Sequence, residues 1–524
     1  MPRRKASGLF IYPFKHLFMN KNVFTESQLA RPNYNTFNLT NDVKLSFDMG
    51  QLVPVFCQEC LPGDRYTIGA DCLIRMAPML APVMHRIDVT VHYFFVPNRI
   101  LWSGWEDFIS GNADIQPPIF VLQQNYYTPL MDYLGFPRPD DPITSFNVNA
   151  LPLAAYQAIW NEYYRDENLV APFDYYIDPG PGVDPETFGL LRRRAWPHDY
   201  YTSALPFAQK GVAVDIPLGN TQPTLVRRAS GGPAGENWVS GTAPATTGNV
   251  TNVPNDIAGA PPGTLGGQLF VPGVGIVPTQ INDLRTAIKV QEMLERDARG
   301  GTRYTETVRA HFGVTSSDAR LQRPEYIVGI KQPVVISEVL NTTGQITDGD
   351  EPGLPQGNMA GHGVSVSTDG HFGTKFCEEH GWIIGVMSVI PLTAYQQGVP
   401  REFLSRNDRY DYFWPTLAHL GEQPIDIREL YVDGIASEPF GYIPRYAEYR
   451  YKPSFVAGDF KTSLSYWHLG RIFENEPALN QDFIECNPSK RIFAVETEQN
   501  SLYAQVLNRV SAKRMIPYFG NPSF

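Results

Sequence analysis

The chain of 524 residues has 43% hydrophobic and 19% charged side chains, including 65 aromatic residues, which is typical of folded globular proteins rather than disordered or fibrous ones. Glycine and proline together account for 89 residues, which predicts many turns and few long helices. No apolar run approaches the roughly 18 residues of a membrane-spanning helix, so no membrane insertion is expected. Five cysteines, an odd and sparse number, predict no disulfide framework and fit a reducing compartment.

The formal net charge of −11 is unevenly distributed along the chain. Residues 1–25 contain five Lys or Arg and no acidic residue, and residues 499–524 contain three and no acidic residue. The remaining body, 26–498, therefore carries −19. We predict two basic, aromatic-rich terminal arms on an acidic body, with one face suited to contacting phosphates.

Several segments have the pattern of β-strands. Residues 87–93 alternate strictly between apolar and polar side chains, and residues 43–57 do so in part; both segments are rich in β-branched and aromatic residues. Between them, LPGD at 61–64 predicts a turn, and the Pro-rich stretch 77–82 predicts a loop. Further strands are predicted at 211–217, 333–340, 381–391, 447–451 and 491–495. Because helices do not alternate regularly with these strands, the pattern favours an antiparallel sandwich.

Two segments have the pattern of helices. Residues 151–167 place apolar side chains on roughly one face. Residues 281–299 begin near Asn282 or Asp283, which can cap a helix, and end at Gly300 and Gly301. We expect both helices to lie in excursions from the sheets.

Residues 219–280 differ in composition from their surroundings, with 12 Gly, 8 Pro and only four charged residues in 62 positions. A loop of this length is usually functional or disordered. It retains apolar residues such as Leu225, Trp238 and Phe270. The preferred interpretation is an ordered projection packed against neighbouring copies, and the alternative is a flexible surface insertion.

Candidate metal and catalytic residues form no recognised pattern. Cys57 and Cys60 have CxxC spacing, but in a strand they would point to opposite faces. His371, Cys377 and His380 form the densest group of ligand-type residues, which is the sole basis for a metal-dependent hydrolase hypothesis. The chain has no HExxH, GxSxG, GxxxxGK[ST] or strand-associated GxGxxG motif. We therefore predict neither an enzyme nor a cofactor.

Basic and aromatic residues are interleaved at three places. Arg192, Arg193 and Arg194 precede Trp196 and His198, a combination that can grip phosphate and stack on bases. The same run fits a charged subunit contact equally well. The termini repeat the pairing with two further basic groups: Arg3, Arg4 and Lys5, and Lys513 and Arg514. For these termini the alternatives are DNA contact and an extended arm lying on a neighbouring subunit.

Several collinear blocks resemble the major capsid proteins of microviruses, small bacteriophages with single-stranded DNA, and most closely the gokushovirus branch. The resemblance covers roughly residues 45–485, and 219–280 matches nothing at the level of sequence. Its blocks are FCQECLPGD at 56–64, YFFVPNR at 93–99, IWNEYYRDEN at 159–168, HDYYTS at 198–203, DARGGTRYTE at 297–306, HFGV at 311–314, ARLQRPEY at 319–326, HLGEQ at 419–423 and RYAEYRYK at 445–452.

The resemblance implies one domain across 1–524: a mainly β, eight-stranded antiparallel jelly roll with long interstrand insertions that contain a few helices. It implies sixty copies in a T=1 shell around circular single-stranded DNA. The partners would be scaffolding, DNA-pilot and small DNA-binding phage proteins and a host receptor. The protein would belong to the virion, assembled in the bacterial cytoplasm. Residues 219–280 would build a protrusion at each threefold axis and attach to the host.

Individual residues receive roles under this interpretation. The intersubunit candidates are Arg299, Arg303, Arg320 and Arg323, and the host-attachment candidates are Arg227, Arg228, Trp238 and Phe270. A divalent cation at subunit junctions would leave no dependable sequence signature outside loops such as the EF-hand. The competing interpretation is a carbohydrate-binding β-sandwich at a cell surface, supported by the aromatic content and the sandwich pattern.

Overall fold

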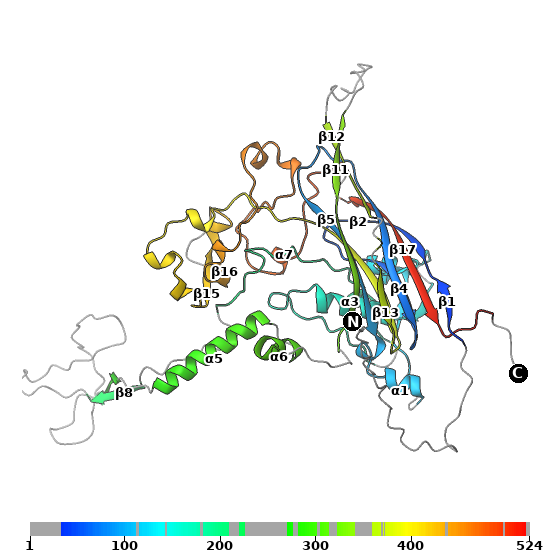
Figure 1. Ribbon diagram of the computed structural model, residues 1–524, viewed down its shortest axis with the longest axis horizontal. Coiled ribbons are helices and arrows are strands. Elements are labelled where there is room, and N and C mark those ends of the chain that lie inside the picture. The colour runs from blue at the N-terminus through cyan, green and yellow to red at the C-terminus, as the bar shows by residue number, and fades with distance from the viewer. Residues whose placement is uncertain are drawn as a thin grey trace, which may run out of the picture.

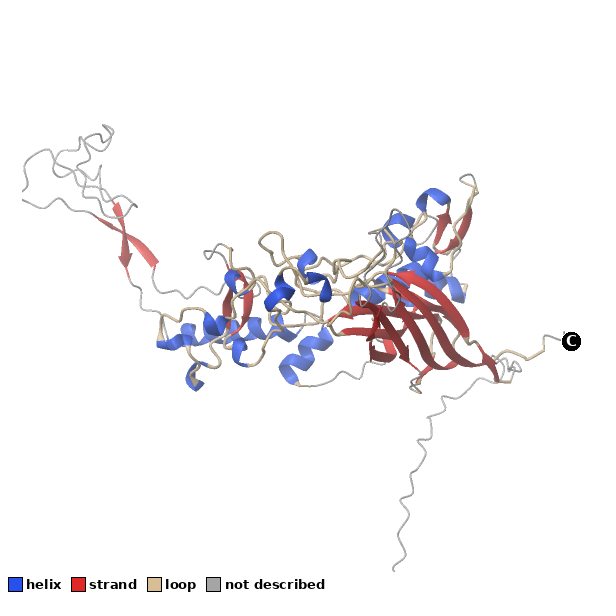
Figure 2. Ribbon diagram, turned by 90° about the horizontal axis from the view of Figure 1, so that it is seen from above, coloured by secondary structure: helices blue, strands red, loops and turns tan. Residues whose placement is uncertain are grey.

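The computed structural model describes residues 33–111, 115–141, 144–178, 182–208, 220–225, 270–275, 281–300, 304–313, 322–340, 359–367, 370, 372–434, 439–495 and 498–519. A twisted β-sandwich occupies one end of the molecule, and helices, turns and short strands extend from it toward the other end (Figure 1, Figure 2). Within those ranges, every helix is too short or too polar to cross a bilayer.

The first sheet has seven antiparallel strands in the order β1–β17–β4–β12–β11, with β2 beside β17 and β13 beside β4. β1 and β2 pair with successive parts of β17, and β12 and β13 pair with successive parts of β4. The strands are β1 Asn35–Asn38, β2 Asn41–Phe47, β4 Arg65–Met76, β11 Val335–Leu340, β12 Met359–Ser367, β13 Gly373–Phe376 and β17 Leu502–Arg514.

The second sheet has four antiparallel strands in the order β10–β5–β14–β3. Its strands are β3 Val53–Cys60, β5 Ile87–Pro97, β10 Glu325–Pro333 and β14 Gly381–Pro391. Only Val334 separates β10 from β11, so the chain passes there from the second sheet to the first. Both faces of β14 are buried, which explains its nearly continuous apolar sequence.

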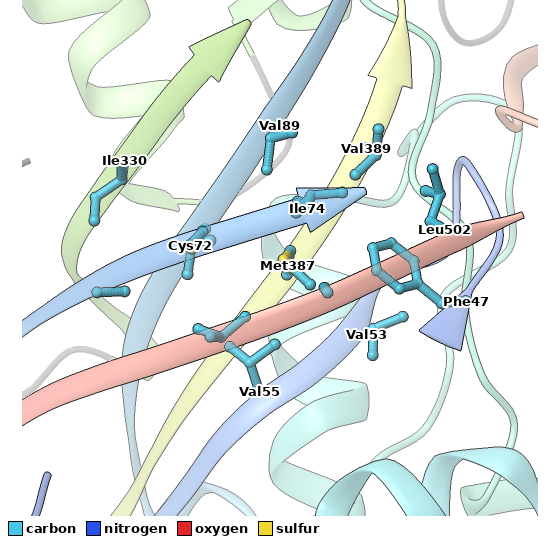
Figure 3. Close-up of a cluster of buried hydrophobic side chains, with 14 of the residues drawn as sticks. Phe47, Val53, Val55, Cys72, Ile74, Val89, Ile330, Met387, Val389 and Leu502 are labelled. Carbon is cyan, nitrogen blue, oxygen red and sulfur yellow. The ribbon is translucent and has the colours of Figure 1, made fainter. Parts of the chain in front are cut away.

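The main core lies between the two sheets (Figure 3). Phe47, Ile74 and Leu502 of the first sheet are fully buried, as are Val53 and Met387 of the second. Successive side chains of a strand point to opposite faces, and these residues occupy the face of each strand that looks toward the other sheet. Burial of such residues contributes about 1.5–3 kcal/mol per large side chain.

A second core covers the opposite face of the second sheet. Its centre is α3, in which every residue from Leu151 to Asn161 is buried. The prediction of a single apolar face is therefore wrong in extent, because the sheet and the surrounding loops enclose this part of the helix on all sides. The elements of this insertion are α1 Trp105–Ser110, β6 Ile119–Leu122, α2 Pro129–Leu134, β7 Phe146–Asn149, α3 Leu151–Tyr163 and α4 Pro185–Phe188.

The remaining elements lie mainly toward the other end of the molecule (Figure 1). α5 is long and leads toward the antiparallel ribbon of β8 and β9, which brackets residues 226–269. The elements are β8 Asn220–Leu225, β9 Phe270–Gly275, α5 Ile281–Gly300, α6 Tyr304–Phe312, β15 Glu422–Asp426, β16 Pro439–Pro444 and α7 Gln481–Ile484.

Several sequence predictions are confirmed and others are wrong. The helix at 281–299, the strand at 381–391 and the turn at 61–64 are confirmed. The strand at 87–93 is confirmed and extends to Pro97. Residues 43–57 are two strands separated by a turn, because Gly50 has a φ of 82° that breaks the strand.

Five further predictions need correction or lie outside the described residues. Residues 447–451 contain a 3₁₀ turn, and 491–495 form a turn with one isolated bridge, so neither is a strand. The prediction of a C-terminal arm at 499–524 is wrong for residues 502–514, which form β17 inside the first sheet. The strand predicted at 211–217 and the arm at 1–25 lie outside the described residues.

Candidate nucleic-acid and subunit interfaces

Two cations face each other on the exposed side of the first sheet. Lys513 of β17 lies directly opposite Arg65 of β4 in the strand register, and both side chains are exposed. Like charges at directly opposed positions destabilise a sheet. Neither cation has a carboxylate partner among the described residues, so this arrangement is suited to an external anion.

Each of these cations also lies near an exposed aromatic ring. The Lys513 ammonium is 5.9 Å from the centre of the Tyr34 ring, and the Arg65 guanidinium is 5.2 Å from that of Phe376. On the same face Arg509 lies 4.8 Å from the Phe372 ring, although it also forms an ion pair of 2.8 Å with Asp71. Rings can stack on unpaired bases while the cations contact phosphates.

Arg514, the other predicted DNA contact of β17, points the opposite way. Its Nε lies 2.9 Å from Oδ2 of Asp64, whose side chain is 2% exposed. Its Nη2 donates to the carbonyl of Glu59 at 2.7 Å and to the Tyr66 hydroxyl. The guanidinium is therefore held within the end of the sandwich, and its position indicates a structural contact.

The run Arg192–Arg194 lies between α3 and the sandwich, half buried. Arg192 packs 4.2 Å from the ring of Trp160. Arg193 donates to the carbonyls of Met49 and Cys486, both at 3.2 Å. These contacts attach the loop that follows α4 to both cores.

Arg194 has hydroxyl partners rather than a carboxylate. Its Nη1 donates to Thr90 at 2.6 Å and to Ser388 at 3.0 Å. It also lines a cavity of about 560 Å³, whose lining contains Arg165, Arg299 and Lys331 as well as the acidic Asp88, Asp166 and Glu167. Of the three arginines, Arg194 is therefore the one whose surroundings leave room for an anion, and DNA contact by the run stays a prediction.

The predicted intersubunit arginines have different environments. Arg299, at the end of α5, forms an ion pair of 2.5 Å with Glu422 of β15, so it already links two elements of one subunit. Arg323 is half exposed and has no ion pair among the described residues. Arg303 and Arg320 lie outside the described residues, as do Arg3, Arg4, Lys5, Arg227, Arg228 and Trp238. Phe270 is the first residue of β9.

The cysteines and histidines do not form a reactive centre among the described residues. Cys57 and Cys60 belong to opposite faces of β3, as predicted, and Cys60 is fully buried. Burial raises the pKa of the Cys57 thiol to about 12, which keeps it protonated. Cys377 is buried in the main core, and the described residues contain no group of three potential metal ligands. His371 lies outside the described residues.

The environment of His92 strongly perturbs its pKa. Its burial, and secondarily the charge of nearby Arg194, lower its pKa to about 4. Its Nδ1 lies 2.7 Å from the Tyr164 hydroxyl, which links β5 to the residue that follows α3. No nucleophile is paired with it among the described residues, so this neutral histidine serves packing.

The sequence comparisons agree with a structural role. A family model described as "Capsid protein (F protein)" matches residues 26–524. The chain belongs to this family of phage capsid proteins. It is thus a structural protein rather than an enzyme, and the resemblance to gokushovirus-type microviruses is confirmed.

Three relatives, each named capsid protein VP1, match this capsid protein over most of its length. The protein of Bdellovibrio phage phiMH2K is 37% identical over 515 residues, covering 91% of this chain and 92% of the relative. That of Chlamydia phage 1 is 35% identical, with 91% and 93% covered. That of Spiroplasma virus 4 is 28% identical, again with 91% and 93% covered.

Proposed function

We propose that this capsid protein assembles in sixty copies into a T=1 icosahedral shell that encloses circular single-stranded DNA. Self-association is what a capsid protein implies, and the relatives match over nine-tenths of their length. Assembly would take place in the host cytoplasm with scaffolding, DNA-pilot and small DNA-binding proteins as partners.

The proposed fold behind this function is an eight-stranded jelly roll. Three pairs of strands can be counted as interrupted single strands: β1 with β2, β12 with β13, and β10 with β11. With that count, eight strands remain: β1/β2–β17–β4–β12/β13 in the first sheet and β3–β14–β5–β10 in the second, with β11, the continuation of β10, pairing with β12 of the first sheet. Two packed antiparallel sheets of this kind are an architecture of viral capsid domains.

We infer that the exposed side of the first sheet faces the DNA. The observation that carries this inference is the opposed pair of Lys513 and Arg65, two cations without a carboxylate partner among the described residues. Arg75 is exposed on the same face and likewise has no ion pair within the described ranges. Arg194 and the N-terminal Arg3, Arg4 and Lys5 are further proposed contacts.

Cryo-electron microscopy of particles from infected or expressing cells tests both proposals. We expect a T=1 shell with the first sheet lining its interior. If the shell forms with that sheet outside, the DNA contact is refuted and the capsid role survives. If no particle forms even with the scaffolding protein present, the shell itself is refuted.

Charge neutralisation provides a second test of the DNA contact. Arg65→Gln combined with Lys513→Gln should lower the slope of log affinity against log salt for single-stranded DNA by about 1.4, at about 0.7 per phosphate contact. Lys44→Gln is the matched control, because Lys44 lies on the same sheet but is paired with Asp42 at 2.7 Å. Equal slopes for the double variant and the control would contradict the inference.

The insertion 219–280 is proposed as the threefold protrusion and the host-attachment element. The ribbon of β8 and β9 lies at the end of the molecule opposite the sandwich (Figure 1), which suits a projection from the shell. Arg227, Arg228, Trp238 and Phe270 remain the proposed attachment residues.

A further inference from the structure

A second exposed surface combines aromatic and arginine side chains far from the first sheet. It comprises residues 401–420 and 445–455 and is called here the aromatic–arginine surface. Large exposed apolar patches on soluble proteins mark interaction sites. Seven aromatic side chains of this surface are at least 44% exposed: Phe403, Tyr410, Tyr412, Phe413, Trp414, Tyr449 and Phe455.

Internal hydrogen bonds hold this surface in one shape. Asp408 and Asp411 form a reciprocal capping box around one of its 3₁₀ turns. The Trp414 indole donates to the carbonyl of Arg409 at 2.8 Å, and the Tyr446 hydroxyl donates to the carbonyl of Tyr410 at 3.1 Å. The aromatic rings are therefore positioned before any partner arrives, which lowers the entropic cost of binding.

Tyr446 supports the surface in a strained conformation. Its φ of 64° makes it the only non-glycine residue with a positive φ among the described residues. Such a conformation costs about 1–3 kcal/mol and persists where surrounding contacts enforce it, frequently at functional sites. Here the Tyr446 N–H donates to Gln423 at 3.1 Å, and its ring packs edge-on against Phe413 at 5.2 Å.

Four arginines of this surface have no carboxylate partner among the described residues: Arg406, Arg409, Arg445 and Arg450. Arg406 lies 4.6 Å from the ring of Tyr412, and Arg409 lies 4.7 Å from that of Tyr410. Arg445 donates to the carbonyl of Tyr410 at 3.0 Å, while its Nε is buried without a hydrogen bond.

The neighbouring acids are already engaged within the subunit. Glu402 pairs with Lys452, and Glu448 accepts a hydrogen bond from Gln423. Asp408 and Asp411 are occupied by the capping box. The surface holds six cations and four acids, a net charge of +2, and none of these acids forms an ion pair with the four arginines among the described residues. Trp, Tyr and Arg are the residues enriched at the energetic centres of protein interfaces.

The insertion that covers the second sheet has the complementary charge. Residues 98–191 contain thirteen acidic residues and three arginines. Glu106 and Asp107 are exposed on α1, and Asp174 and Asp178 are exposed on the adjoining loop. The loop is fixed beside the start of α1, because the N–H of Ile177 donates to the carbonyl of Leu101 at 2.8 Å.

The acidic patch also has exposed apolar groups. Ile109 of α1 is 50% exposed and Tyr176 of the loop is 47% exposed. None of Glu106, Asp107, Asp174 and Asp178 forms an ion pair with a described residue. The patch thus presents both carboxylates for arginines and apolar surface for aromatic rings.

We propose that the aromatic–arginine surface of one subunit docks onto the acidic insertion of a neighbouring subunit. The two surfaces lie on different parts of the same chain, so the contact is head-to-tail and generates rings when the rotation closes. This inference rests on the proposed assembly into a closed shell and names the surfaces that join its subunits.

Charge reversal and its compensation test the pairing. Arg406→Glu with Arg409→Glu should reduce the yield of particles at least tenfold, as should Glu106→Lys with Asp107→Lys. A quadruple variant that combines both pairs should recover most of the wild-type yield. Asp174→Lys with Asp178→Lys provides a second compensating pair. Lys461→Glu is the control, a single charge reversal at an exposed residue outside both surfaces.

The assay is light scattering and electron microscopy of particles, with circular dichroism of each unassembled variant to check folding. The arginine variant and the acidic variant alter different surfaces. If one of them fails to fold, the particle yield of the other still tests the pairing. Normal assembly of both reversed variants, or failure of both compensating pairs to restore assembly, would overturn the pairing.

Two other results are separable from this one. Normal assembly of the arginine variant with reduced DNA content would assign its surface to DNA and overturn the inference. Absence of wild-type particles would instead refute the proposed shell function, and the inference with it.

Discussion

Arg514 and Lys513, adjacent residues at the end of β17, should differ in how their replacement changes the free energy of unfolding. Arg514 is 14% exposed at its side chain and lies 2.9 Å from the carboxylate of Asp64, which is 2% exposed. Lys513 points to solvent on the other face of the same strand. Arg514→Met should therefore lower the free energy of unfolding, whereas Lys513→Met should leave it nearly unchanged.

The expected magnitude follows from the charge that each variant leaves behind. In Arg514→Met, the Asp64 carboxylate still accepts the hydrogen bond from the N–H of Leu61 at 3.1 Å. It loses Arg514, the one cation that pairs with it among the described residues. Removing one partner of a buried pair costs about 3–5 kcal/mol, and the 14% exposure of Arg514 favours the lower end of that range. Lys513→Met should change stability by less than about 0.5 kcal/mol.

Urea denaturation of unassembled subunits, followed by tryptophan fluorescence, measures both changes. A double-mutant cycle with Asp64→Asn should give a coupling energy of about 2–3 kcal/mol between Asp64 and Arg514. If Arg514→Met and Lys513→Met are equally stable, the assignment of Arg514 to the interior of the sandwich is refuted. The same pair of variants should reverse order in a DNA-binding assay, where Lys513→Met is the weaker binder.

Three other measurements address separate parts of the subunit. Burial lowers the pKa of His92 in the folded subunit to about 4, so the folded state favours the neutral imidazole. The free energy of unfolding should therefore be highest above pH 6.5 and fall by about 3 kcal/mol as the pH drops toward 4. His92→Gln should flatten this part of a plot of urea midpoint against pH. Gly50→Ala should lower the free energy of unfolding by about 3 kcal/mol or more, because the added Cβ would lie 1.8 Å from the carbonyl oxygen of Cys486. Gly135→Ala should cost only about 1–2 kcal/mol, because Gly135 has a φ of 94° but open space around its Cβ position. Equal denaturation midpoints for the two variants would contradict this reasoning. Replacing 219–280 by a tight turn should leave particles visible by electron microscopy but reduce their adsorption to host cells. If particles no longer form, the insertion is instead an essential contact between subunits.

The fold class was predictable because hydrophobic patterns report which strands are buried. The strand at 381–391 was found with its observed bounds, since burial on both faces requires a continuous apolar run. β17 was missed because Arg509 and Lys513 gave its solvent face the appearance of a basic tail. Its buried residues Leu502, Val506 and Val510 carried the period-two signal that identifies a strand.

The roles of individual cations were less predictable than the fold. Lys513 and Arg514 are neighbours in sequence, and only the strand register shows that one faces solvent and the other Asp64. Arg192 was nominated from its sequence neighbours, yet its guanidinium packs on Trp160. These contacts join residues distant in sequence, and no local pattern encodes them.

The aromatic–arginine surface was missed although a local signal was present. Residues 406–414 read RNDRYDYFW, which interleaves basic and aromatic residues as densely as the run that contains Arg192. What sequence could not supply was exposure, because aromatic residues are more often buried than exposed. Tyr412 and Trp414 become informative only when the structure leaves them 55% and 48% exposed.

The outer face of the second sheet is apolar and must be covered, whereas the outer face of the first sheet is polar and can face water. This difference makes the two sides of the subunit distinct. Phe94 and Ile384 of the second sheet are apolar on the face away from the main core, so that face must be covered, and the acidic insertion covers it. The first sheet presents Thr67, Gln505 and Lys513 instead, which are soluble without a cover. Only the first sheet therefore has an open face, and it carries cations while the cover of the second carries acids. A polyanion would be repelled by one side and attracted by the other, so charge alone favours a single orientation of the subunit around enclosed DNA.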